Sequence, residues 1–188
     1  KDFPRMPETN TLLDELVKAG LQVYSVGKID DIFGGRGITH SNHTPDNLTS
    51  IQATLDFLKA DFSGMMFINL IEGDMIYGHR NDAPGYARAL EQIDTSIPAL
   101  QAAMRPDDIC FIVADHGVDP TTPSTDHSRE NSPLLVFGQP VRANVNLGTR
   151  QSFADVAATL AEVFNLPAPA IGESFLSELI SKKTSKVS

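Results

Sequence analysis

The chain has 188 residues, of which 41% are hydrophobic. That is enough for a packed core in one domain, or in one domain plus part of another, and it excludes a disordered chain. The formal net charge of −9 at pH 7 argues against nucleic acid or an anionic membrane surface as the main partner. An acidic balance also suits a protein whose carboxylates are partly neutralised by bound cations.

The single cysteine, Cys110, lies in the apolar run ICFIV and is predicted to be a buried thiol. One cysteine excludes a disulfide within the chain, so we expect a reducing, cytoplasmic setting. No stretch approaches the roughly 18 apolar residues of a membrane span, and no membrane partner is expected. The opening segment KDFPRMPETN is polar and broken by proline, which is typical of an interior linker and predicts a longer polypeptide.

Helical and strand-like segments alternate along the first half of the chain. Residues 11–19 have apolar side chains at helical spacing and stop at a glycine, and residues 21–26 form the first predicted strand. Residues 27–47 contain glycines and a proline and are predicted to be a loop. A helix over residues 46–60 is predicted to begin with Asp46 as its cap.

The second half continues the alternation. Three apolar runs of buried-strand length are residues 64–71, 108–114 and 133–137. Helices are predicted over residues 84–104, which contain Pro98, and over residues 152–164, which begin with Ser152. Strands that are apolar throughout, rather than at every second position, are typical of a sheet covered by helices on both faces. We therefore expect an α/β fold with its sheet sandwiched between helices.

Two of the predicted strands lead directly into polar loops. Residues 64–71 are followed by EGDMIYGHR, and residues 108–114 by DHGVDP. In open α/β sheets, ligands bind beyond the carboxyl ends of the strands. The two loops are therefore expected to form one shared site.

The histidines indicate what that site binds. His79, His116 and His127 each lie near a carboxylate, namely Asp74, Asp115 and Asp126 respectively. Carboxylate and imidazole without thiolate suit Mn²⁺ or Zn²⁺, and two neighbouring divalent ions can clamp the oxygens of a transferring phosphoryl group. One such pair in a loop is usually a turn residue beside a solvated imidazole, but three pairs at strand exits favour a metal site.

Two points remain open at the level of spacing. The side chains of adjacent Asp115 and His116 diverge on an extended backbone, so either a turn brings both to one ion or they serve different ions. His40 and His43 have no strand exit beside them, and we interpret both as surface loop residues.

The segments NLIEGDMIYGHRND and VADHGVDPTTPSTDHSRENSPLLVFG resemble the phosphopentomutase family, within the alkaline phosphatase superfamily. ADHG, DPTTPSTDHSRE and Asp-Xaa4-His with a trailing Arg match in order and at the family's spacing. GKIDDIFGGRGIT is similar to the segment just after the family's cap domain. The resemblance covers nearly the whole chain, and it implies an alkaline-phosphatase-like core. Residues 1–20 would be the end of the cap or linker and an entry helix, and residues 21–188 the C-terminal part of the metal-binding core.

The resemblance also implies roles for individual residues. Two divalent ions are expected, with Mn²⁺ as the expected metal. Asp115 and His116 would bind the first ion, whereas the ligands of the second would be Asp74, His79 and His127. Lys28 would reach the substrate phosphate, a task that suits a lysine as a point charge, although a lone exposed lysine is more often simply solvated.

Other positions have weaker assignments or depart from the family pattern. Asp126 has no ligand role there, and a turn residue or a group that orients an imidazole is the preferred interpretation. Arg80 and Arg129 are weak candidates for phosphate contacts. Gly73 stands where relatives usually have Phe, and Val118 where they usually have Asn.

The family's nucleophilic threonine, an N-terminal Asp ligand and most of the cap domain belong to a first half that these residues do not contain. We assign no nucleophile here, and the missing N-terminal half of the same polypeptide is an expected partner. The implied activity is an isomerase reaction that interconverts the 1-phosphates and 5-phosphates of ribose or deoxyribose. It would proceed through a phosphothreonine enzyme, with a sugar bisphosphate as activator.

Two alternatives accompany this hypothesis. The first is another enzyme of the superfamily, such as a cofactor-independent phosphoglycerate mutase or a phosphatase, against which TDHSRE and the Lys28 segment argue. The second is a metal-binding fragment without activity of its own, because the nucleophile is missing.

Overall fold

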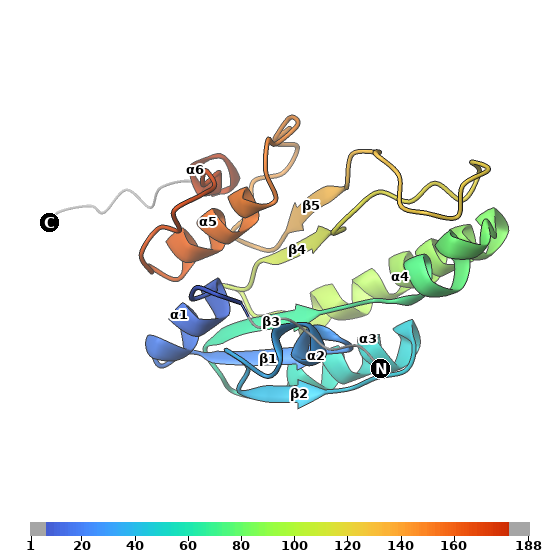
Figure 1. Cartoon of the computed structure of the whole chain (residues 1–188). Coiled ribbons are helices and arrows are strands. Elements are labelled where there is room, and N and C mark those ends of the chain that lie inside the picture. Colours follow the sequence, from blue (N-terminus) through green and yellow to red (C-terminus); the bar gives the residue numbers. More distant parts are fainter. Residues whose placement is uncertain (1–6, 181–188) are drawn as a thin grey trace, which may run out of the picture. The chain divides into compact units, whose positions relative to one another are not determined.

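The computed structural model describes residues 7–180 (Figure 1). Most of the predicted opening linker falls on residues 1–6, which lie outside the described part. The chain divides into two compact units, Lys1–Met104 with Ala114–Ser132, and Arg105–Val113 with Pro133–Ser188. Within residues 7–180, no helix combines the length and the apolar character that crossing a membrane requires.

The first unit is built on a three-stranded parallel sheet with the order β2-β1-β3. Its central strand β1 is Gln22–Val26, and its edge strands are β2, His40–Asn42, and β3, Gly64–Ile68. The predicted strands at 21–26 and 64–71 are confirmed, although β3 ends at Ile68. Four of the five residues of β1 are buried, whereas all those of β3 are partly exposed, because within the described residues β3 pairs on one edge only.

Helices pack against this sheet. α1 is Leu12–Lys18 and begins with a capping box at Thr11, while α3 is Asn47–Phe57 and is capped by Asp46, as predicted. α4 is Ala83–Ala103 and continues through Pro98. Figure 1 shows the short helix α2 in front of β1 and α3 behind it, and both contact that strand. The predicted sheet with helices on both faces is thus present in this unit.

The loop predicted for residues 27–47 was wrong, because this segment contains both α2, Ile29–Phe33, and β2. α2 is anchored by the buried side chain of Ile29 and stops at Gly34, whose φ of 59° is left-handed. β2 consists of three exposed polar residues, so it lacks the hydrophobic pattern of a strand. It is held by pairing with β1, where the rings of His40 and Tyr24 stack at 4.2 Å.

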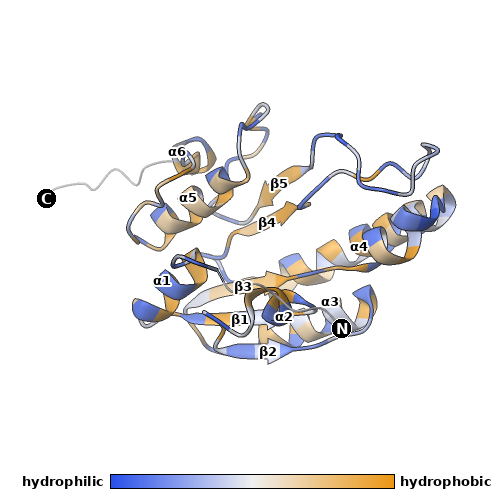
Figure 2. Ribbon diagram, in the orientation of Figure 1, coloured by the Kyte–Doolittle hydropathy of each residue, from blue (hydrophilic) through white to orange (hydrophobic). Residues whose placement is uncertain are grey.

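The second unit contains an antiparallel pair, β4, Cys110–Val113, and β5, Leu134–Phe137. The expected single sheet is therefore divided into two, and the side chains of this pair are only partly buried. α5, Ala154–Val163, starts one residue after Phe153 rather than at Ser152, and the last helix, α6, is Leu176–Leu179. Figure 2 shows β3, β4 and β5 in hydrophobic colours and the segment that follows β4 in hydrophilic ones.

Candidate metal centre

Two short helical turns after β3 carry the first pair of predicted ligands. The π-helical turn η1, Gly73–Tyr77, holds Asp74, and the 3₁₀ turn η2, Gly78–Arg80, holds His79. The guanidinium of Arg80 donates a hydrogen bond to the carbonyl oxygen of Met75, so this arginine fixes the turn that bears Asp74. π-helical turns are rare and occur frequently at functional sites.

The second pair of histidines is brought together by a β-bridge. Gly117 pairs with Ser128 in antiparallel fashion, and the backbone N–H of Ser128 donates to the carbonyl oxygen of Gly117 at 3.0 Å. A Cβ on Gly117 would lie 2.8 Å from the carbonyl oxygen of Glu130, so only glycine permits this approach. As a result, the rings of His116 and His127 stack with their centroids 3.5 Å apart.

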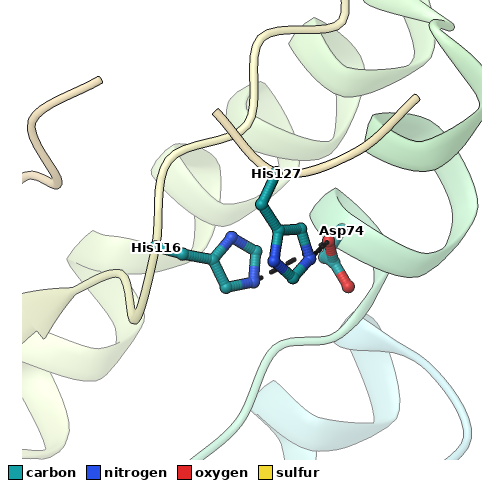
Figure 3. A group of neighbouring side chains, drawn as sticks. All are labelled: Asp74, His116 and His127. Atoms are coloured by element: carbon teal, nitrogen blue, oxygen red, sulfur yellow. Dashed lines mark ion pairs between the residues drawn. The ribbon is translucent and has the colours of Figure 1, made fainter. Parts of the chain in front are cut away.

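Three imidazoles converge on one carboxylate oxygen. The Nε2 atoms of His79 and His127 each lie 3.3 Å from Oδ1 of Asp74, and Nε2 of His116 lies 3.9 Å from it. Figure 3 shows His116 and His127 entering from the loop after β4 and turning toward Asp74. Ligand atoms of Asp74, His116 and His127 all lie within 4.8 Å of one another, a spacing that one metal ion can bridge.

Backbone carbonyl groups orient two of the imidazoles. Nδ1 of His79 lies 2.5 Å from the carbonyl oxygen of Thr125, and Nδ1 of His116 lies 3.2 Å from that of Gly117. A carbonyl oxygen can only accept a hydrogen bond, so Nδ1 carries the proton in both rings. In the neutral imidazole Nε2 then presents a lone pair to Asp74, which is the tautomer that binds a metal.

The surroundings of the Asp74 carboxylate fit a positive charge between this carboxylate and the imidazoles. Its Oδ1 is buried, and no N–H or O–H group among residues 7–180 donates a hydrogen bond to it. An oxygen and imidazole nitrogens that all present lone pairs repel one another unless a cation, either a ring proton or a metal ion, lies between them. The residues therefore fit a divalent metal ion, and a donor set of carboxylate and imidazole suits Mn²⁺ or Zn²⁺.

Sequence comparison agrees with this geometry. Residues 1–168 match the model of the Metalloenzyme superfamily. The chain belongs to the metalloenzyme superfamily. The superfamily is named for its metal centres, which agrees with a metal site at the cluster of Asp74, His116 and His127.

Individual relatives within the superfamily are similar over almost the whole chain. The phosphopentomutase of Herpetosiphon aurantiacus is 62% identical over 178 residues, which are 95% of this chain and 46% of that protein. The phosphopentomutases of Acetivibrio thermocellus and Lachnoclostridium phytofermentans are 53% and 48% identical, each over 96% of this chain and 46% of their own length. The chain thus spans about half the length of the curated relatives it matches.

The remaining predicted site residues lie at the margin of the cluster. Asp115 has an 87% exposed side chain, and its Oδ1 is 3.6 Å from Nε2 of His116. Nζ of Lys28 is exposed and lies 2.8 Å from Sδ of Met75, the residue after Asp74. Asp126 uses its backbone N–H to bind Oγ of Ser124, a turn contact that agrees with the preferred interpretation of this residue.

Several supporting residues were missed at the level of sequence. Nδ2 of Asn81 donates to the carbonyl oxygen of Thr122 at 3.0 Å and so ties the loop after β3 to the loop after β4. Tyr86 lies close enough to Asp74 that burial first, and the nearby carboxylate second, raise the pKa of its phenol. Asn81 and Tyr86 follow His79 by two and seven residues, and this closeness in sequence was the one signal for them. Their partners, Thr122 and Asp74, are not adjacent to them in sequence.

Proposed function

We propose that this chain is the metal-binding part of a phosphopentomutase, which interconverts the 1-phosphates and 5-phosphates of ribose or deoxyribose. The observation that carries the proposal is the convergence of three imidazoles on the buried oxygen of Asp74, in a chain 62% identical to one phosphopentomutase. The nucleophilic threonine, which becomes a phosphothreonine, belongs to the other half of the polypeptide. Residues 21–188 serve as the C-terminal part of the metal-binding core, after a cap or linker end at residues 1–20.

The proposed centre holds two Mn²⁺ ions. Asp115 and His116 bind the first, and Asp74, His79 and His127 bind the second. Nε2 of His116 lies 3.6 Å from Oδ1 of Asp115 and 3.9 Å from Oδ1 of Asp74, so this imidazole stands between two carboxylates, which supports two neighbouring ion positions. When bound, the two ions neutralise the charge of the phosphoryl group and polarise its oxygens.

The chain's own cation, Lys28, binds the substrate phosphate in this proposal. Its ammonium lies next to Met75 and is exposed, which leaves its remaining donors available to phosphate oxygens. A compact point charge suits a phosphate that must first bind and then leave. The other partner molecules are the ribose and deoxyribose phosphates and a sugar bisphosphate as activator, in a cytoplasmic setting.

The activity is tested with a chimeric protein. The part of the Herpetosiphon aurantiacus phosphopentomutase that precedes its match is joined to this chain, loaded with Mn²⁺ and supplied with a sugar bisphosphate. Conversion of ribose 1-phosphate to ribose 5-phosphate is expected, and His127→Ala should lower it by at least about a hundredfold because a metal ligand is lost. His43→Ala, an exposed histidine outside the cluster, is the matched control and should retain activity.

Two results would contradict the proposal. A chimera that turns over 3-phosphoglycerate but not ribose 1-phosphate would identify a phosphoglycerate mutase instead. Because a chimera can also fail to fold, Mn²⁺ is titrated separately into the 188-residue chain and followed by electron paramagnetic resonance. A folded chain that leaves all Mn²⁺ free in solution would overturn the metal centre.

A further inference from the structure

A reciprocal pair of hydrogen bonds joins the start of α3 to the residue that precedes the metal-bearing turn. The backbone N–H of Asn47 donates to Oε2 of Glu72 at 2.9 Å, and the backbone N–H of Glu72 donates to Oδ1 of Asn47 at 3.3 Å. Glu72 stands immediately before η1 and two residues before Asp74. We infer that Asn47 and Glu72 are positioning residues, which fix the carboxylate of Asp74 for metal binding.

The carboxylate of Glu72 is well placed for this task. The first backbone N–H groups of a helix have no partner within the helix, and a negative charge there is favoured by the helix dipole. α3 has 11 residues and presents the N–H of its first residue, Asn47, to Glu72. One carboxylate oxygen of Glu72 therefore accepts a hydrogen bond from the start of the helix. Glu72 is not a member of the group formed by Asp74, His116 and His127.

The side chain of Asn47 points to a geometric role rather than to stability. Asn47 is fully buried, and its Nδ2 has no hydrogen-bond acceptor among residues 7–180. A buried donor without a partner is unfavourable, so an apolar residue of similar size would suit the core better if stability were the sole constraint. What Asn47 supplies is Oδ1, which holds the backbone of Glu72 and thereby the entry to η1.

The link matters because it lies at the entry to the turn that carries Asp74. β3 ends at Ile68, and the chain continues to Asp74 through a π-helical turn, a conformation that is rare and frequent at functional sites. The middle of this turn is held by Arg80 through the carbonyl oxygen of Met75, and its near end is held by the pair formed by Asn47 and Glu72. Loss of the near anchor lets Asp74 move away from the histidines, and metal affinity is sensitive to such displacements.

The inference rests on the proposed metal centre, and the test separates the two. Mn²⁺ affinity of the 188-residue chain is measured by calorimetric titration, and the bound ion is characterised by electron paramagnetic resonance. Glu72→Ala and Asn47→Ala each remove one of the two hydrogen bonds of the pair, and each should weaken Mn²⁺ binding about tenfold. The double variant removes both bonds and should bind Mn²⁺ more weakly than either single variant. Glu72→Gln keeps an acceptor oxygen and should restore most of the affinity.

The matched control is Asp46→Ala. Asp46 caps the same helix through Thr49 but does not touch Glu72, so this variant should unfold at lower urea concentration while it binds Mn²⁺ like the unaltered chain. Normal affinity in both Glu72→Ala and Asn47→Ala would overturn the inference. So would equal losses in Glu72→Gln and Glu72→Ala, or a loss of the same size in Asp46→Ala. No Mn²⁺ binding by the unaltered chain would instead overturn the metal centre itself.

Discussion

His79 holds its Nδ1 atom 2.5 Å from the carbonyl oxygen of Thr125. This contact joins the loop after β3 to the loop after β4 and fixes both the tautomer and the direction of the imidazole. The partner is a backbone atom, so the orientation of His79 does not depend on the side chain at position 125. The metal-binding geometry is therefore set by the path of the backbone as much as by the ligands.

Removal of one imidazole tests the cluster directly. His127→Ala removes an Nε2 atom that lies 3.3 Å from Oδ1 of Asp74, and bound Mn²⁺ should fall by at least about tenfold. Elemental analysis of protein equilibrated at limiting metal measures the effect. His43→Ala is the control, because His43 pairs with Asp30 away from the cluster; unchanged metal content in His127→Ala would remove this residue from the ligand set.

A single methyl group should open the second metal-bearing loop. In Gly117→Ala the added Cβ meets the carbonyl oxygens of Glu130 and Ser128 at 2.8 and 2.9 Å, so the β-bridge separates and His116 and His127 lose their stacked arrangement. Mn²⁺ affinity is expected to drop by about tenfold or more.

The control for that substitution lies in the other metal-bearing loop. A Cβ on Gly73 makes only an ordinary contact of 3.6 Å with Tyr86, so Gly73→Ala should bind Mn²⁺ with nearly normal affinity. Calorimetric titration of both variants compares them, and equal affinities would show that the approach at Gly117 is unimportant for the site.

The sequence predicted which side chains lie together better than it predicted how they meet. Asp74 and His79 lie on one loop, and their proximity follows from spacing alone. The stacking of His116 and His127 depends on the bridge from Gly117 to Ser128. No periodic pattern in the sequence predicts this bridge. The anchor between Asn47 and Glu72 joins residues 25 positions apart, and such a pair leaves no local pattern.

The helices and strands likewise divide into those that the sequence predicted and those that it did not. Helices α1, α3, α4 and α5 and strands β1, β3, β4 and β5 each have an apolar pattern long enough to be recognised. α2 is too short for a helical period, and β2 consists of polar residues that pair with β1. The separation of β4 and β5 into a second sheet was also unpredictable, because strand pairing is a long-range property.

Acid should weaken the second unit through Asp155. The backbone N–H of Glu173 and the guanidinium of Arg150 hold the pKa of Asp155 below its ordinary value. Because the folded-state pKa is lowered, this contribution to stability is present above the unfolded-state pKa and is lost as the pH falls below about 4. Asp155→Asn should therefore be less stable than the unaltered chain at pH 7, and the difference should shrink in acid.

Urea unfolding followed by circular dichroism at pH 7 and pH 3 measures this change. Asp126→Asn, in an exposed loop, is the comparison and should follow the unaltered chain at both values. A difference between Asp155→Asn and the unaltered chain that stays constant with pH would contradict the role of the Asp155 carboxylate.

The thiol of Cys110 should be slow to react. Burial raises its pKa to about 11, so its thiolate fraction at pH 8 is about a hundredfold below that of an exposed cysteine, and the thiolate is the reactive form. Modification by a disulfide reagent should be slow in native buffer and fast in concentrated urea. Equal rates under the two conditions would mean that Cys110 is accessible in the folded chain.

The bridge between Gly117 and Ser128 turns the residues between them into a closed ring. His116 and His127 each directly precede a residue of the bridge, so the bridge sets the distance between them. The turn around Thr121 and Pro123 lies on this ring, and it contacts the loop after β3 through the carbonyl oxygens of Thr122 and Thr125. The bridge therefore sets the spacing of His116 and His127, whereas the turn ties that pair to the loop that carries His79.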